Sequence, residues 1–166
     1  MPPDILCFSR NRCTSVEQID DQTIRSSCRL QDTLTDASVE LLVKLPDLEI
    51  IHATGKFHRT IQKECLSPDD ALKKVLGVRI GSGMLKIIKG LIGETSECKQ
   101  LAFMVEECCH GVILSFTKDS LDQAPKDIAL TKEFYANLIK GNIRLYNRCA
   151  AFAQGSSLVE GIDPPE

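Results

Sequence analysis

Two cysteines of this 166-residue chain occupy positions where a thiol could do chemistry. Cys65 lies in the connection that leads to a helix start at Ser67-Pro68. Cys98 lies near the start of the amphipathic helix pattern Gly93 to Lys118, the longest before the C-terminal one, where backbone N–H groups favour a thiolate. We expect the two sulfurs to approach each other at one exposed edge of the predicted sheet, as ligands of a shared metal ion or small cluster. The alternative, two unconnected buried thiols, stays open.

Four further residues are candidates for a supporting role. Cys149 is a third candidate metal ligand, although its place on the apolar face of the predicted last helix favours packing. Within the run Cys108-Cys109-His110, successive side chains on a helix diverge by about 100°, so Cys108 and Cys109 cannot share one metal ion through a regular helix. Cys109 lies on the apolar face of its predicted helix, which is expected to pack in the core. Cys108 and His110, together with Gln100, remain accessory residues that could contact a cofactor or a partner subunit.

The elements that would position these residues follow from hydrophobic periodicity. Residues 5 to 60 predict strands, because apolar side chains alternate with polar ones and turn residues separate the runs. The predicted strands are Ile5 to Phe8, Thr23 to Leu30, Ser38 to Leu45 and Leu48 to Arg59. Short links between successive strands indicate an antiparallel meander that is covered on one face.

The hydrophobic period changes from two to 3.6 near Cys65. Helices are then predicted from Ser67 to Gly77, from Gly81 to Gly93, from Gly93 to Lys118 and from Asp127 to Phe152. The expected fold is therefore α+β, with an N-terminal antiparallel β-sheet covered by a C-terminal set of about four helices. We expect a single domain over 1–154 and a flexible tail over 155–166. The predicted inward positions include Ile51 in the last strand and Ile87 in the second helix.

Composition excludes several classes of protein. The net charge is −3 and the basic residues are scattered, which argues against a nucleic-acid partner. No apolar run approaches the roughly 20 residues of a membrane helix, and the N-terminus lacks a signal-peptide pattern. We therefore expect a cytoplasmic protein with no membrane partner. Eight cysteines without a C-x-x-C pair argue against a disulfide framework or a zinc ribbon, and this cysteine content is typical of an anaerobic source.

Several short stretches resemble the DUF2889 family, a bacterial domain of unknown function. The family has a Cys, which Cys65 resembles, and a Leu-x-Gly-x-x-Ile-x-x-Gly stretch, which resembles the run from Leu76 to Met84. It also has a Gly-Cys-Thr-His-Leu element, which resembles Ile92-Gly93 followed by Glu97 to Leu101. The N-terminal runs Asp20 to Thr23 and Leu30 to Thr33 resemble its Asp-Asp-Gly and Leu-x-Asp-Thr elements. At Gln100 this chain departs from the family, which has His there.

The order of elements also resembles iron–sulfur scaffold proteins of the NifU/IscU type. Strands, a cysteine loop, helices and a cysteine at the head of a long helix occur in that order. The resemblance implies that Cys65 and Cys98 hold a nascent cluster or accept sulfur. The middle scaffold cysteine has no counterpart between Val75 and Gly83.

Three functions are consistent with these patterns. The first is an accessory protein that handles a transition metal or an iron–sulfur cluster through Cys65 and Cys98, for a partner that is another protein. The second is a non-catalytic interaction module, in which the thiols are merely buried. The third is a thiol-dependent transferase with Cys98 as the nucleophile. Each of these three functions is compatible with a homo-oligomer. No sequence pattern establishes enzymatic turnover.

Overall fold

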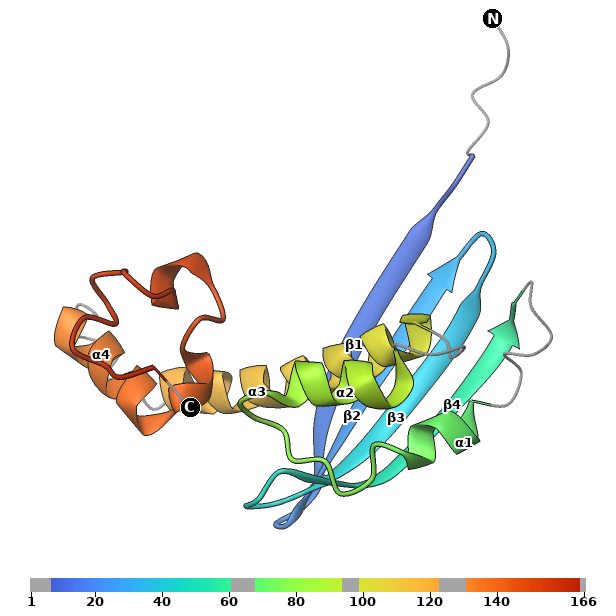
Figure 1. Ribbon diagram of the computed structural model, residues 1–166, viewed down its shortest axis with the longest axis horizontal. Coiled ribbons are helices and arrows are strands. Elements are labelled where there is room, and N and C mark those ends of the chain that lie inside the picture. The colour runs from blue at the N-terminus through green and yellow to red at the C-terminus, as the bar shows by residue number, and fades with distance from the viewer. Residues whose placement is uncertain (1–6, 61–67, 94–98, 123–130, 165–166) are drawn as a thin grey trace, which may run out of the picture. The chain divides into compact units, whose positions relative to one another are not determined.

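The computed structural model describes residues 7–60, 68–93, 99–122 and 131–164 (Figure 1). Contacts divide the chain into two compact units, Met1–Val112 and Ile113–Glu166, which are taken in turn. The first unit holds a four-stranded antiparallel sheet followed by helices, so the α+β prediction is confirmed. The prediction of one domain over 1–154 with a flexible tail over 155–166 stays a prediction.

The sheet is a meander in which each strand pairs antiparallel with the next one along the chain. Its strands are β1 (Arg10–Asp20), β2 (Thr23–Asp32), β3 (Asp36–Lys44) and β4 (Glu49–Arg59). In β2 and β3, alternation at period two puts every second side chain on one buried face. That face includes Ile24, Cys28, Val39, Leu41 and Val43.

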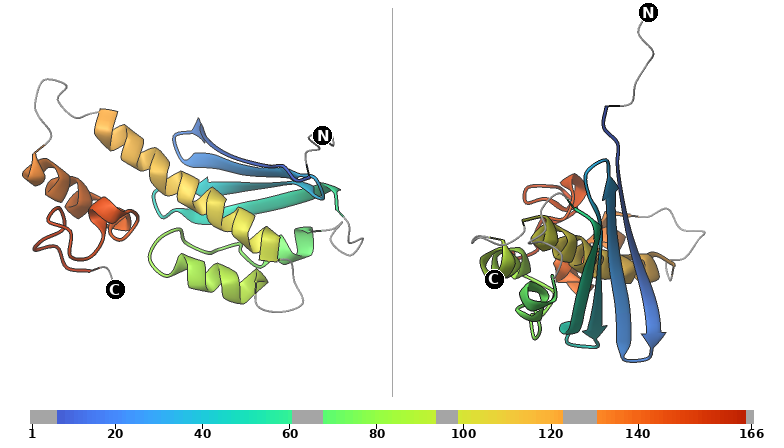
Figure 2. Two further views of the ribbon diagram at one scale, coloured as in Figure 1. Left: turned by 90° about the horizontal axis from the view of Figure 1, so that it is seen from above. Right: turned by 90° about the vertical axis from the view of Figure 1, so that its right-hand side faces the viewer.

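Helices α1 (Asp69–Lys73), α2 (Met84–Ile92) and the first half of α3 (Lys99–Asp122) complete the first unit. α2 and α3 lie side by side in both Figure 1 and Figure 2. Gly111 lets α3 approach the sheet closely, because a Cβ there would lie 3.0 Å from methyl groups of Thr14 and Val16. The hydroxyl of Ser26 donates a hydrogen bond to the carbonyl oxygen of Cys108 at 2.8 Å. These contacts fix α3 on the buried face of β1 and β2.

The outer edge of β4 is covered by the chain that follows it. Gly77 and Ile80 donate backbone hydrogen bonds to the carbonyl oxygens of Ile50 and Leu48, at 2.8 and 2.9 Å. The Gly55 N–H donates to a carboxylate oxygen of Asp69 at 3.4 Å. Backbone groups that are paired in this way cannot recruit a further strand.

The second unit contains α4 (Lys132–Gly141) and two short 3-10 helices, η2 (Ile143–Leu145) and η3 (Ala150–Phe152). Its buried residues include Ile139, Leu145, Tyr146 and Val159. The predicted single helix from Asp127 to Phe152 is wrong beyond Gly141, because Asn142 leaves the helical region with φ −139° and ψ 76°. Residues 127–130 lie outside the described part of the chain.

Three details of the first unit differ from the sequence-based prediction. The sequence did not predict the strand β1. The predicted strand Ile5 to Phe8 has no strand structure in its described part. Ile51 is 44% exposed, because the register shifts between Leu42 and Val43 and Ile50 becomes the buried residue. Ile87 is 49% exposed, because the buried residues of α2 are Met84, Ile88 and Ile92, which recur at a spacing of four.

Candidate functional site

The predicted cysteine pair, Cys65 and Cys98, lies outside the described residues, so the approach of the two sulfurs stays a prediction. Pro68 follows Cys65 by three residues, and Lys99 follows Cys98 directly. Pro68 is buried against β4, with its Cγ 3.3 Å from the position of a Cβ at Gly55. α3 packs on the same face of the sheet as Pro68, since Ser26 of β2 donates a hydrogen bond to the carbonyl oxygen of Cys108. Pro68 and α3, which follow Cys65 and Cys98 in the sequence, therefore lie on the same side of the sheet.

A groove lies between the end of α2 and the start of α3, just after Cys98 in the chain. It is lined by Lys89, Gly93, Lys99, Ala102, Phe103 and Glu106. The guanidinium carbon of Arg12 lies 4.9 Å from the ring centroid of Phe103. Three cationic side chains, from Arg12, Lys89 and Lys99, are thus near the start of this helix. Cations and a helix N-terminus both favour the ionised form of a nearby thiol.

The two cysteines in the middle of α3 belong to the core. Cys108 is fully buried, and its Sγ lies 3.9 Å from the Val39 carbonyl oxygen. Burial raises the pKa of the Cys108 thiol well above its usual range and raises the pKa of Cys109 to about 12. Both thiols are therefore protonated near neutral pH, and neither presents a surface to a ligand.

The remaining accessory candidates lie on the same helix. Gln100 is half-buried in the first turn of α3. His110 is also half-buried, and its Nδ1 lies 4.0 Å from a carboxylate oxygen of Glu107, one turn earlier. Gln100 is thus close in sequence to the groove, whereas His110 lies about three turns further along α3.

Cys149 belongs to the second unit and is exposed. It precedes η3 with extended backbone angles, φ −150° and ψ 169°. The expectation that Cys149 packs on an apolar helix face is wrong, because α4 has ended at Gly141. Its role as a third metal ligand stays a prediction.

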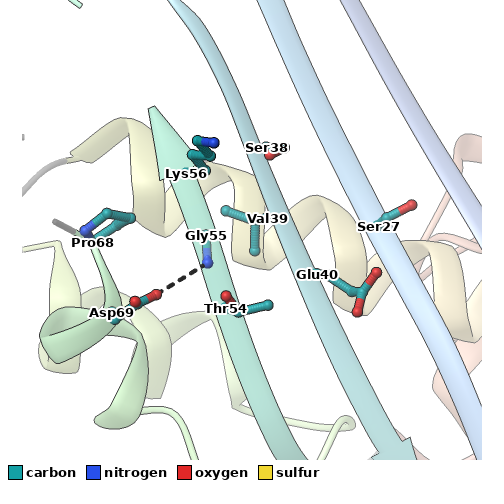
Figure 3. A pocket seen from close by; sticks show the side chains of 9 residues that line it. All are labelled: Ser27, Ser38, Val39, Glu40, Thr54, Gly55, Lys56, Pro68 and Asp69. Carbon is teal, nitrogen blue, oxygen red and sulfur yellow. Dashed lines mark hydrogen bonds between the residues drawn. The ribbon is translucent and has the colours of Figure 1, made fainter. Parts of the chain in front are cut away.

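A polar hollow that sequence reasoning missed lies at β4 and the open face of the sheet (Figure 3). Its side chains include Ser27, Ser38, Glu40, Thr54 and Lys56. Because strand residues alternate between faces, the polar positions of β2, β3 and β4 could have indicated this surface. Hydroxyl, carboxylate and ammonium groups can bind a polar molecule, but they do not form a nucleophile–base arrangement by themselves.

Within the described ranges, no group of three or more His, Cys, Asp or Glu side chains could hold a metal ion. In the same ranges, no helix combines the length and apolar character needed to cross a bilayer. Comparison with family models, curated proteins and solved structures finds no match for this chain. The resemblances to DUF2889 and to NifU/IscU-type scaffolds therefore stay expectations.

Proposed function

We propose that this chain is an accessory protein that binds a transition metal or an iron–sulfur cluster through cysteine thiolates. Cys98 is the central ligand, Cys65 is its partner, and Cys149 is a candidate third ligand. The observation that carries the proposal is the cationic groove that follows Cys98, with Lys89 and Lys99 in its lining. Cations stabilise the thiolate that a soft metal requires, and they offset the negative charge of a thiolate-bound cluster.

The described residues that follow the two cysteine segments also support the proposal. Pro68 packs on Gly55 of β4, and α3 packs on the same face of the sheet. Thiolate sulfur is the donor type that iron–sulfur clusters and zinc select, so the residue types fit the group. We place the activity in the cytoplasm, where a reducing environment keeps such cysteines free of disulfides.

The experiment is purification of the full chain without oxygen, followed by iron, zinc and sulfide analysis and a visible absorption spectrum. We expect bound metal in the unaltered protein and its loss in Cys98→Ser and in Cys65→Ser. Cys13→Ser is the matched control, because Cys13 is an exposed thiol on β1 that is not among the proposed ligands. Metal-free protein, or equal metal content in Cys98→Ser and the control, would contradict the proposal.

A second candidate function is a non-catalytic interaction module. It is favoured by the burial of Cys28, Cys108 and Cys109, whose raised pKa values identify them as packed thiols. If the purified protein holds no metal, alkylation kinetics of Cys98 distinguish the remaining alternatives. Fast alkylation at neutral pH supports a nucleophilic thiol, whereas slow alkylation supports the interaction module.

A further inference from the structure

The layer formed by α1, α2 and their connection has an unusual charge distribution. From Asp69 to Ile92 this layer has five basic residues and two acidic residues, Asp69 and Asp70, at its start. The layer therefore carries a net charge of +3, whereas the whole chain carries −3 and the other residues together carry −6. The five cations of this basic layer are Lys73, Lys74, Arg79, Lys86 and Lys89.

All five cations of the basic layer are exposed. α2 explains the arrangement, because Met84, Ile88 and Ile92 recur at four-residue spacing and are buried. Lys86 and Lys89 lie between these positions, so they project away from the core. In α1, Lys73 forms an exposed ion pair with Asp70 at 2.8 Å, a contact that competes weakly with a binding partner.

Two large apolar side chains are exposed in the same layer. Leu76 is 44% exposed and Ile87 is 49% exposed. Single exposed apolar residues are common, but here they lie in a layer with five exposed cations. Apolar contacts surrounded by charged side chains are typical of a surface that binds another protein.

We propose that the basic layer docks an acidic, amphipathic helix of a partner protein. Nucleic acid fits less well, because the layer has one arginine and no aromatic residue for stacking on bases. A bilayer also fits less well, because an interfacial helix inserts its apolar face, whereas α2 buries its own against the core. An acidic helix with a few apolar side chains complements both the lysines and Leu76 with Ile87. The inference is independent of the metal site.

The probe is a fluorescent synthetic helix with glutamates on most faces and leucines along one stripe, titrated with the full chain at low salt. We expect Lys74→Glu with Lys86→Glu, two exposed positions outside the groove, to weaken binding at least about tenfold, a loss of about 1.4 kcal/mol. The matched control is Lys44→Glu with Lys56→Glu, which makes the same charge change on exposed strand positions. This control should change the affinity less than about twofold.

The apolar part of the surface has its own test. Leu76→Ser with Ile87→Ser should also weaken binding, a response that adsorption by charge alone would not give. Circular dichroism and metal analysis of each variant show that the fold and the proposed metal site are retained.

Three results would overturn the docking proposal. They are absence of binding to the acidic helix, an equal loss in the strand-lysine control, and tighter binding to phosphatidylglycerol vesicles or to a DNA duplex than to the helix. Because metal content is measured separately, failure of the docking proposal is distinguishable from failure of the metal proposal.

Discussion

Gly55 on β4 is a residue whose surroundings leave no room for a side chain. A Cβ at this position would lie 2.8 Å from Leu72 Cδ1 and 3.3 Å from Pro68 Cγ. Leu72 is fully buried, so it cannot move into solvent. We expect Gly55→Ala to lower the free energy of unfolding by about 1–3 kcal/mol, as overpacking does.

Gly90 in α2 is the control for this substitution. It is exposed, and a Cβ there meets no described atom within 4 Å. Gly90→Ala should raise the free energy of unfolding by about 0.5–1 kcal/mol, because glycine is unfavourable inside a helix. Urea unfolding of the two variants measures both changes. Equal effects of the same sign would show that the close contact at Gly55 does not matter.

Asp32 is a buried carboxylate at the end of β2. Its Oδ2 accepts a hydrogen bond from Arg10 at 2.7 Å, and its Oδ1 accepts the backbone N–H groups of Leu34 and Thr35. Burial raises the pKa of this carboxyl, but these hydrogen bonds outweigh burial and hold the pKa below its usual value of 3.8. The charged form of Asp32 therefore stabilises the folded state.

The pH dependence of stability follows from the sign of this shift. Because the folded pKa is lower than the unfolded pKa of about 3.9, the contribution is complete above that value and is lost as the pH falls through the folded pKa. We expect Asp32→Asn to be less stable than the unaltered protein at neutral pH, with a difference that shrinks below pH ~4. Denaturant unfolding at several pH values measures the difference. A difference that is constant down to pH ~3 would contradict this assignment.

At the scale of elements, the interface between α3 and the sheet determines thiol reactivity. Cys28 from β2 and Cys108 from α3 are both buried at this interface, whereas Cys13 on the outer side of β1 is exposed. We expect iodoacetamide at neutral pH to modify Cys108 at least about a hundredfold more slowly than Cys13, since burial lowers both access and thiolate fraction. Mass spectrometry of peptides over time measures the two rates. Similar rates in folded protein would mean that α3 separates readily from the sheet.

The elements with a clear period were predictable from sequence. Alternation in β2 and β3 identified the buried residues correctly, as the pairing of Cys28 with Val39 shows. β1 was missed because all of its residues except Val16 are exposed, so neither face has an apolar series. Ile51 was misplaced because a bulge in the β3–β4 ladder changes which residue faces inward, and no local pattern encodes that shift.

The candidate site was less predictable than the sheet. Burial of Cys109 followed from the three- and four-residue spacing of apolar positions on α3. The exposure of Cys149 did not follow from its pattern, because the helix break after Gly141 depends on local backbone geometry. The groove brings residues of α2 and α3 together, and Arg12 of β1 lies against its Phe103; such long-range proximity has no signature in sequence spacing. The proposed pair of Cys65 and Cys98 stays a prediction.

At the scale of the whole molecule, the two units differ in how much structure protects their backbone. The first unit has four paired strands and a large buried core, whereas the described part of the second has the end of α3, the ten-residue α4 and two 3-10 helices. We expect hydrogen exchange to be slowest in β2 and β3 and faster throughout residues 131–164, because local opening costs less where few apolar contacts are broken. Exchange measured by mass spectrometry tests this order. Equal protection of α4 and β3 would show that the units open together.

The order of elements along the chain also has a consequence during synthesis. All four strands lie between Arg10 and Arg59, whereas the helices that cover their apolar face begin at Asp69 and continue to Val112 in the first unit. At about 5–20 residues per second, a ribosome needs roughly 2–9 s to add the covering segment. A meander with short connections pairs its strands faster than that. The nascent sheet therefore presents Leu41, Val43 and Ile50 to the surrounding solution during this interval, and we expect chaperones that bind apolar strands to associate with the growing chain.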